Sequence, residues 1–408
     1  MSASVVPDVS DEVLIARAYL SRVGEPASVG LWALVRELGP IDAVAALRAG
    51  RVAPRLLGET AARRERIDPA ADLAAAERHG LRLVVPESPD WPHFAFAALE
   101  KAALPRAAAW QDGAAARNES GDPMPPLALW VRGPADLSTL GVRSVGIVGS
   151  RSATQYGLAV TAQFAYGLAA AGVVVVSGGA YGIDAAAHRA ALAAEGTTVI
   201  ISAAGLDRPY PPSNATLFDR ASATGLVISE SPPGCAPHRH RFLTRNRLIA
   251  AFSTGVVVIE AAARSGATNT AGHARLLGRP LMAVPGPITS TYSAGCHALL
   301  QRDPDPAVLV TSVQDVLAVV GGAGEGLPAA VGSAPAGDIR DELDRLDPLS
   351  RTVFEGLPAR GYARPEEIAV RCGVSPLDVV RTLPTLDHAG LLDSADGGYR
   401  IAARVRRR

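Results

Sequence analysis

The feature that most constrains the fold of this chain is a series of short, β-branched runs that begins at residue 144. Their starts lie roughly 25–30 residues apart, which is the period of a strand–helix unit in an α/β sheet. Most segments between them are rich in Ala and Leu and fit helices, for example 158–171 and 185–194. Because the runs are apolar throughout, they suit parallel strands buried on both faces. The pattern predicts an α/β fold with a Rossmann-like, doubly wound, mostly parallel sheet, whose strands are expected at Ser144–Val148, Val173–Val176, Thr198–Ser202, Leu226–Ser229, Val256–Glu260, Leu281–Val284 and Val308–Thr311.

Regions of different composition flank this series. The 408 residues correspond to two or three domains at about 150 residues each. In the tail, three short helical segments precede a hairpin with a Gly-Gly turn, which is typical of a winged helix. A small helical tail domain without affinity for nucleic acid remains the alternative. The predicted division is an N-terminal, sterile-alpha-motif-like helical domain (1–104), a loop or insert (105–126), a Rossmann-like domain (127–320), a flexible linker (321–337) and a winged-helix-like domain (338–408).

The charge balance excludes one class of nucleic-acid-binding protein. Lys+Arg and Asp+Glu each total 40, so the net charge is zero and a uniformly basic coat protein is excluded. A local basic patch remains compatible, and arginine would supply it because Lys101 is the only lysine. The three cysteines are far apart and predict no disulfide framework. We see no signal-peptide pattern and no apolar run long enough for a membrane span, so we expect a cytoplasmic protein without a membrane partner.

Three loops at the carboxyl ends of predicted strands are rich in residues that suit phosphate. They contain Gly149-Ser150-Arg151, the stretch 177–184 with Gly178 and Gly179, and the stretch 265–270. Glycine lets an anion approach the backbone, hydroxyls and amides donate hydrogen bonds, and a guanidinium matches phosphate geometry. Tight turns and helix caps explain part of the same pattern, and we expect Asp184 to be a plain N-cap.

One segment departs from the neutral average. Residues 231–255 contain no Asp or Glu, and Phe242 lies among several basic side chains. Arginines beside an aromatic ring suit phosphate contact combined with base stacking, as in proteins that bind single-stranded nucleic acid. The alternative is a solvated loop, or a helix start, whose arginines pair with acids elsewhere. The basic residues are Arg239, Arg241, Arg245 and Arg247, with His238 and His240.

Missing motifs exclude several enzyme classes. The chain has no Gly-x-x-x-x-Gly-Lys, which excludes a P-loop NTPase, and no G-x-S-x-G elbow, which argues against an α/β-hydrolase. The first turn gives Gly146-x-x-Gly149, and no acid follows the second strand, so a dinucleotide oxidoreductase is disfavoured. Cys235, His238 and His240 form a poor zinc pattern. We expect no cofactor, no metal and no catalytic residue.

The motifs, in this order, resemble the DNA processing protein A (DprA, also called Smf) family over residues 127–311. The resemblance implies a non-enzymatic protein that binds single-stranded DNA, protects incoming DNA and loads the RecA recombinase in natural transformation and homologous recombination. It also implies a homodimer formed through the Rossmann-like domain. The motifs are VGIVGSR, VVSGGAYGID, GLDRPYPPSN, ISE, FLTRNRLIA, VVVIEAAARSGATNT, MAVPG and SAGCH.

The resemblance also assigns residues. The arginine of the family's G-S/T-R motif is Arg151, the R-N-R motif starts at Arg245, and the S-G-x-x-x-T motif starts at Ser265. Combined with the loops and the basic segment, the residues expected to bind DNA are Gly149, Ser150, Arg151, Gly178, Gly179, Arg239, Arg241, Phe242, Arg245, Asn246, Arg247, Ser265, Gly266 and Thr270.

A second hypothesis comes from another functional class. The same loops could bind a nucleotide, as a sensor or as a phosphoribohydrolase-like enzyme of the lysine-decarboxylase-like group. Glu260 or Glu230 would then be the catalytic acid. That group carries a P-G-G-x-G-T loop, whereas Ser265-Gly266-Ala267 stands in this region here, which disfavours the hypothesis.

Overall fold

The computed structural model describes residues 9–113, 122–139, 141–263, 265–321, 346–359, 361–388, 391–395, 398–402 and 405. The chain divides into two compact units, residues 1–328 and residues 329–408. Among the described residues, no helix combines the length and the apolar character that crossing a membrane requires.

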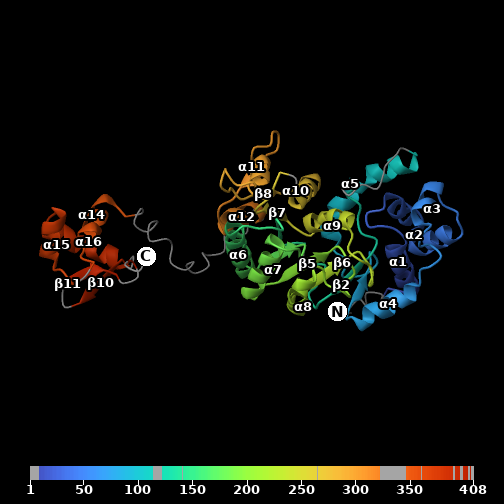
Figure 1. Ribbon diagram of the computed structural model, residues 1–408, viewed down its shortest axis with the longest axis horizontal. Helices are drawn as coiled ribbons and strands as arrows, with labels where there is room; N and C mark the ends of the chain where they lie inside the picture. Colours follow the sequence, from blue (N-terminus) through green and yellow to red (C-terminus); the bar gives the residue numbers. More distant parts are fainter. Residues whose placement is uncertain are drawn as a thin grey trace, which may run out of the picture. The chain divides into compact units, whose positions relative to one another are not determined.

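The first unit is built on one nine-stranded sheet with the order β1-β2-β6-β5-β4-β3-β7-β8-β9 (Figure 1). Strands β3 to β9 are parallel where they pair, and β1 and β2 form an antiparallel edge. The Rossmann-like prediction is therefore confirmed, and each predicted strand corresponds to one of β3 to β9. The bounds are β1 Arg82–Val84, β2 Leu129–Arg132, β3 Ser144–Val148, β4 Val174–Ser177, β5 Thr198–Ser202, β6 Leu226–Ser229, β7 Gly255–Val258, β8 Leu281–Ala283 and β9 Val308–Leu309.

Helices cover both faces of the sheet. Side chains of α5, α9, α10 and α11 pack on one face, and those of α6, α7 and α12 pack on the other, where α8 also lies against α7 (Figure 1). Successive strand residues such as Ile147 and Val148 enter the two different cores, which is why these strands read as continuously apolar. The bounds are α5 His93–Gln111, α6 Gln155–Ala170, α7 Ile183–Ala193, α8 Ala215–Thr224, α9 Arg239–Ala251, α10 Gly266–Leu276, α11 Ala294–Leu300 and α12 Val313–Val320.

The N-terminal helices have a core of their own. It contains Tyr19, Leu20, Leu31 and Leu47, all buried. Ser28 caps the second helix, because its hydroxyl accepts a hydrogen bond from the Leu31 N–H. The predicted helices of this region are therefore present. Their bounds are α1 Asp11–Val23, α2 Val29–Arg48, α3 Pro54–Thr60 and α4 Pro69–Arg78.

The region around residue 104 differs from the prediction. Residues 82–84, expected inside a helical domain, form β1 and extend the sheet beside β2. Helix α5 continues to Gln111, so residues 105–111 are helical and not part of a loop, while 114–121 of the expected insert lie outside the described residues. On α5, Phe96 packs edge-on against Phe252 with ring centroids 5.1 Å apart. This apolar contact draws the helix onto the sheet.

The second unit contains the elements expected in the tail. Helices α14 (Pro348–Gly356), α15 (Pro365–Cys372) and α16 (Pro376–His388) precede the antiparallel strands β10 (Leu392–Ala395) and β11 (Gly398–Ile401). Its apolar core is separate from that of the sheet. Three helices and a hairpin fit the winged-helix prediction, which stays a prediction. Of the expected linker, only Gly321 lies within the described residues.

Candidate nucleic-acid interface

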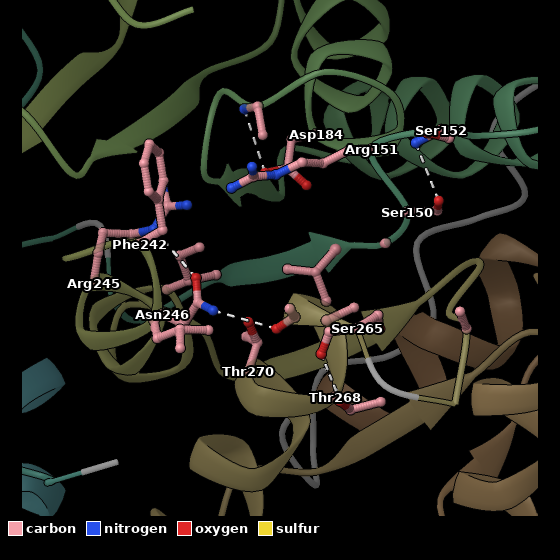
Figure 2. Close-up of a pocket in the computed structure, with 18 of the residues that line it drawn as sticks. Ser150, Arg151, Ser152, Asp184, Phe242, Arg245, Asn246, Ser265, Thr268 and Thr270 are labelled. Atoms are coloured by element: carbon pink, nitrogen blue, oxygen red, sulfur yellow. Dashed lines mark hydrogen bonds between the residues drawn. The ribbon is translucent and has the colours of Figure 1, made fainter. Parts of the chain in front are cut away.

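A cleft of about 1000 Å³ opens at the carboxyl edge of the parallel strands (Figure 2). Its walls come from the β3–α6 loop, the start of α7, helix α9 and the start of α10. The fold thus brings together most of the residues predicted from three separate segments. Those that line the cleft are Gly149, Ser150, Arg151, Arg239, Phe242, Arg245, Asn246, Ser265, Gly266 and Thr270, while Gly178, Gly179, Arg241 and Arg247 lie behind or beside it.

The β3–α6 loop is held tightly from behind. The Ser150 N–H donates to the Glu260 carbonyl at 2.8 Å. A Cβ at Gly149 would stand 2.5 Å from the Ile183 side chain, so only glycine fits where this loop crosses α7. The Glu260 carboxylate accepts hydrogen bonds from the N–H (2.9 Å) and the hydroxyl (2.5 Å) of Thr154. The loop is therefore fixed, and Arg151 at its tip is exposed.

Arg151 and two aromatic rings form a cluster at one wall. The Arg151 guanidinium carbon lies 4.9 Å from the centre of the Phe242 ring, and the rings of Phe242 and Tyr210 are 5.6 Å apart. Arg151 reaches from its loop toward Phe242 on α9 (Figure 2). Within the described residues, neither Arg151 nor the exposed Arg239 forms an ion pair with a carboxylate. Both guanidinium groups are therefore available to an anion.

The basic segment forms helix α9, and two of its arginines are already paired. Arg241 donates twice to the Glu25 carboxylate at 2.8 Å, and Arg247 donates twice to Glu230 at 2.6 Å. Both side chains are buried and neither lines the cleft. The expectation that Arg241 and Arg247 contact phosphate does not fit this placement. These two residues follow the alternative interpretation of this segment, in which its arginines pair with acidic residues elsewhere in the chain.

Arg245 has an intermediate position, buried but at the floor of the cleft. It donates to the Gly178 carbonyl at 2.7 Å and to the Ile201 carbonyl. Burial lowers the pKa of Arg245 to about 10, which still leaves it charged at neutral pH. A Cβ at Gly178 would stand 2.4 Å from the guanidinium. Gly178 and Gly179 are both buried; Gly178 supports Arg245, whereas Gly179 lies against Ile200 and Phe218. Gly178 also lines a smaller pocket of about 60 Å³, together with Arg151 and Phe242.

Asp184 is not the N-cap that we expected. The N-cap of α7 is Gly182, whose φ of +74° disfavours any side chain. Asp184 instead lies inside the first turn and lines the cleft, where its carboxylate accepts a long hydrogen bond from the Ala180 N–H at 3.4 Å. Burial raises the pKa of Asp184, and the charge of Arg245 opposes this shift.

The start of α10 forms the opposite wall. Asn246 donates to the Gly266 carbonyl at 3.3 Å and to Asn269 at 3.0 Å, so α9 and α10 are joined directly (Figure 2). The buried Ser265 hydroxyl oxygen has no hydrogen-bond partner within the described residues. The first N–H groups of a helix also lack intrahelical partners and favour an anion. Ser265, Gly266 and Thr270 therefore present hydrogen-bond donors to the cleft.

The group Cys235, His238 and His240 shows no metal-site geometry. The two imidazole rings stack with centroids 5.8 Å apart, and His240 Nε2 lies 2.9 Å from a Glu25 oxygen. In the part of the chain that the structure describes, no three His, Cys, Asp or Glu side chains gather as metal ligands would. Asp184 and Tyr210 are among the cleft residues that were not predicted to bind DNA from the sequence. The only sequence signals were the glycines before Asp184 and the prolines after Tyr210.

The comparisons with known proteins agree with one another. A family model described as DNA recombination-mediator protein A matches residues 114–321. The chain is 48% identical, over 392 residues, to a protein named DNA processing protein DprA of Mycobacterium tuberculosis H37Rv, covering 96% of this chain and 95% of that protein. It is 35% identical to protein Smf of Escherichia coli K12, covering 69% and 74%. The X-ray structure of DNA processing protein A from Streptococcus pneumoniae aligns with a TM-score of 0.57 and 29% identity, over 76% of this chain and 98% of that one. The chain belongs to the DNA processing protein A (DprA/Smf) family.

Proposed function

We propose that the cleft binds single-stranded DNA. The observation that carries the proposal is the convergence of two exposed arginines without a carboxylate partner, Arg151 and Arg239, with the adjacent rings of Phe242 and Tyr210. Guanidinium groups bind phosphate, and an aromatic ring binds the flat face of a base that is not paired in a duplex. The combination therefore favours single strands over duplex.

The predicted residues divide into three roles in this proposal. Those in contact with DNA are Ser150, Arg151, Arg239, Phe242, Ser265, Gly266 and Thr270. Those that shape the cleft from below are Gly149, Gly178, Gly179, Arg245 and Asn246. Arg241 and Arg247 anchor α9 to the rest of the unit through their carboxylate partners.

In the cell, we propose that the chain protects incoming DNA and loads the RecA recombinase during natural transformation and homologous recombination. Family membership supports this role, together with a cytoplasmic homodimer formed through the Rossmann-like domain. We further propose that the chain acts by binding and not as an enzyme. Of the two candidates for the catalytic acid of a phosphoribohydrolase-like reaction, Glu230 is paired with Arg247 and Glu260 is hydrogen-bonded to Thr154. Release of free base from nucleoside monophosphates would contradict this part.

The direct test is titration of labelled single-stranded and duplex oligonucleotides at two salt concentrations. We expect tighter binding of the single strand and a steep loss of affinity with salt, because bound phosphates release counterions. Arg151→Ala should weaken binding to every sequence and reduce the slope of log affinity against log salt by roughly 0.7, the value of one phosphate contact on a single strand.

Arg55→Ala is the matched control for this titration. Arg55 pairs with Glu59 on its own helix, α3, and does not line the cleft. Its variant should bind like the wild type. Preference for duplex, or an Arg151→Ala variant with wild-type affinity and salt slope, would contradict the proposal.

A further inference from the structure

We infer that Glu25, in the loop between α1 and α2, is a positioning residue for DNA binding. It holds the first turn of α9, and that turn carries Arg239 and Phe242 into the cleft. The inference rests on the proposed function of the cleft. It adds a role for the N-terminal helices, which contribute no side chain to the cleft lining.

The Glu25 carboxylate is surrounded by basic side chains. Arg241 donates to both of its oxygens at 2.8 Å, His240 Nε2 lies 2.9 Å from one of them, and Arg63 donates a further short hydrogen bond. Burial alone would raise the pKa of Glu25, but the hydrogen bonds from Arg241, Arg63 and His240 hold it well below its usual range. The Glu25 carboxylate is therefore an anion at neutral pH. It connects the N-terminal helices to α9.

Helix α9 lacks the features that stabilise a helix start. Its first three residues, 239–241, are Arg, His and Arg, and the N-cap residue His238 makes no capping hydrogen bond through its side chain. Helix N-termini favour acidic side chains and side-chain caps, because the exposed N–H groups carry partial positive charge. The negative charge missing from α9 itself comes from Glu25, more than 200 residues earlier in the chain.

Loss of the Glu25 charge would move the side chains of α9 that we propose to contact DNA. The Arg241 side chain is 7% exposed, and besides Glu25 its hydrogen-bond partners are the Ala236 carbonyl, at 3.1 Å, and the Cys235 thiol. A buried guanidinium without its carboxylate must reach water, so the first turn of α9 has to shift. Phe242 follows Arg241 directly in the chain, and its contacts with Arg151 and Tyr210 depend on that turn.

Glu25 could instead have the opposite role and weaken DNA binding, and its removal would then have a different effect. If the carboxylate masked Arg241 and His240 from DNA, its removal would free two cations. Affinity would then rise and its salt dependence would become steeper, because each new phosphate contact adds to the slope. The geometry favours positioning over masking, since Arg241 is buried and lies outside the cleft.

The test compares Glu25→Gln with Glu87→Gln in the full-length chain. Glu87 forms an equivalent ion pair with Arg17, at 2.6 Å. Among the described residues, no ion pair joins Glu87 to α9. We expect Glu25→Gln to lower the affinity for single-stranded DNA roughly fivefold to tenfold without a steeper salt slope, the size of effect expected for a lost supporting contact. Glu87→Gln should keep wild-type affinity, and thermal unfolding should show that both variants are folded.

A double-mutant cycle separates positioning from general stability. If Glu25 acts through Phe242, then Glu25→Gln should have little further effect on affinity in a Phe242→Leu background. Equal affinity of Glu25→Gln and wild type, additive effects in the cycle, or a gain in affinity would each overturn the inference. If Glu25→Gln does not fold, Arg63→Gln replaces it, and unchanged affinity of that variant would overturn the inference too. A wild-type chain that fails to bind single-stranded DNA would instead refute the proposed function.

Discussion

The four arginines of helix α9 have four different surroundings. Arg239 is exposed at the cleft, Arg241 is paired with a loop acid, Arg245 lies under the cleft floor, and Arg247 is fully buried with Glu230. Arginines two residues apart, such as Arg239 and Arg241 or Arg245 and Arg247, point to different sides of a helix, so the four cannot all face one ligand. This explains why an acid-free segment supplies one exposed cation to the cleft.

A buried histidine near this floor gives a pH-dependent prediction. Burial lowers the pKa of His188 to about 3, from 6.5 in the unfolded chain, and the nearby charges of Arg245 and Arg189 act in the same direction. Below pH 6.5 the unfolded state therefore takes up a proton that the folded state does not. The free energy of unfolding should fall as the pH drops from 6.5 toward 5, with a contribution of up to about 1.4 kcal/mol per pH unit.

Denaturant unfolding between pH 7.5 and 5 checks this prediction. His188→Gln should unfold more easily at pH 7.5, because it loses the contact with Thr198 at 2.7 Å, but its stability should depend less on pH. His79→Gln, at an exposed helix end, should keep the wild-type dependence. Identical pH dependence in the wild type and His188→Gln would show that His188 is not the titrating group.

At the scale of elements, the start of α10 offers a test of how closely DNA approaches the backbone. An added Cβ at Gly266 or at Gly272 would meet no atom of the described residues within 4 Å, so this part of the fold accepts alanine at both positions. Gly266 lines the cleft, and Gly272 lies on the same helix away from it. We expect Gly266→Ala to lower single-strand affinity by about tenfold, equivalent to about 1.4 kcal/mol, and Gly272→Ala to bind like wild type.

Both variants should unfold at or above the wild-type temperature, since alanine favours helix over glycine. Oligonucleotide titration with thermal melts of each variant measures the two effects separately. Equal affinities for Gly266→Ala and Gly272→Ala would place the DNA backbone away from the start of α10.

The strands and loops also show how much of the fold and of the cleft could be predicted from the sequence. The strands β3 to β8 were predictable because they are buried on both faces, and local apolar runs report that burial directly. The three loops of the cleft were predictable for the same reason, since each follows a strand. The two residues of β9 are exposed, and that strand was predictable from its β-branched run and its spacing. The edge strand β1 was not, because only one of its three residues, Val84, is buried and the strand carries no alternation long enough to recognise. The partners of Arg241 and Arg247 were not either, because ion pairs between distant segments leave no local signal.

At the scale of the whole chain, the two units lead to a prediction about the tail. Every residue that lines the cleft lies in residues 1–328, and residues 346–402 contribute to a separate core. The exposed side of α16 carries Leu377 (57% exposed) and Val380 (50%), with Arg381 beside them. An apolar surface of this kind is more typical of a protein contact than of DNA binding. We expect a chain ending at residue 328 to bind single-stranded DNA as tightly as the full-length protein.

Titration of both chains with the same oligonucleotides at two salt concentrations measures this. The melting temperature of the shortened chain controls for damage to the sheet. A marked loss of affinity with an unchanged melting temperature would show that the tail contacts DNA, and would favour a DNA-binding winged helix over a protein-binding one.

The antiparallel edge of the sheet limits where a chain with this fold can be truncated. Because β1 pairs with β2 and α5 packs on Phe252, a chain cut near residue 104 would leave β2 as a bare edge strand beside an uncovered apolar face. Such an edge readily recruits strands from other molecules. The N-terminal region is thus not a removable accessory. It completes the sheet, and any relative without it needs another segment to close the same edge.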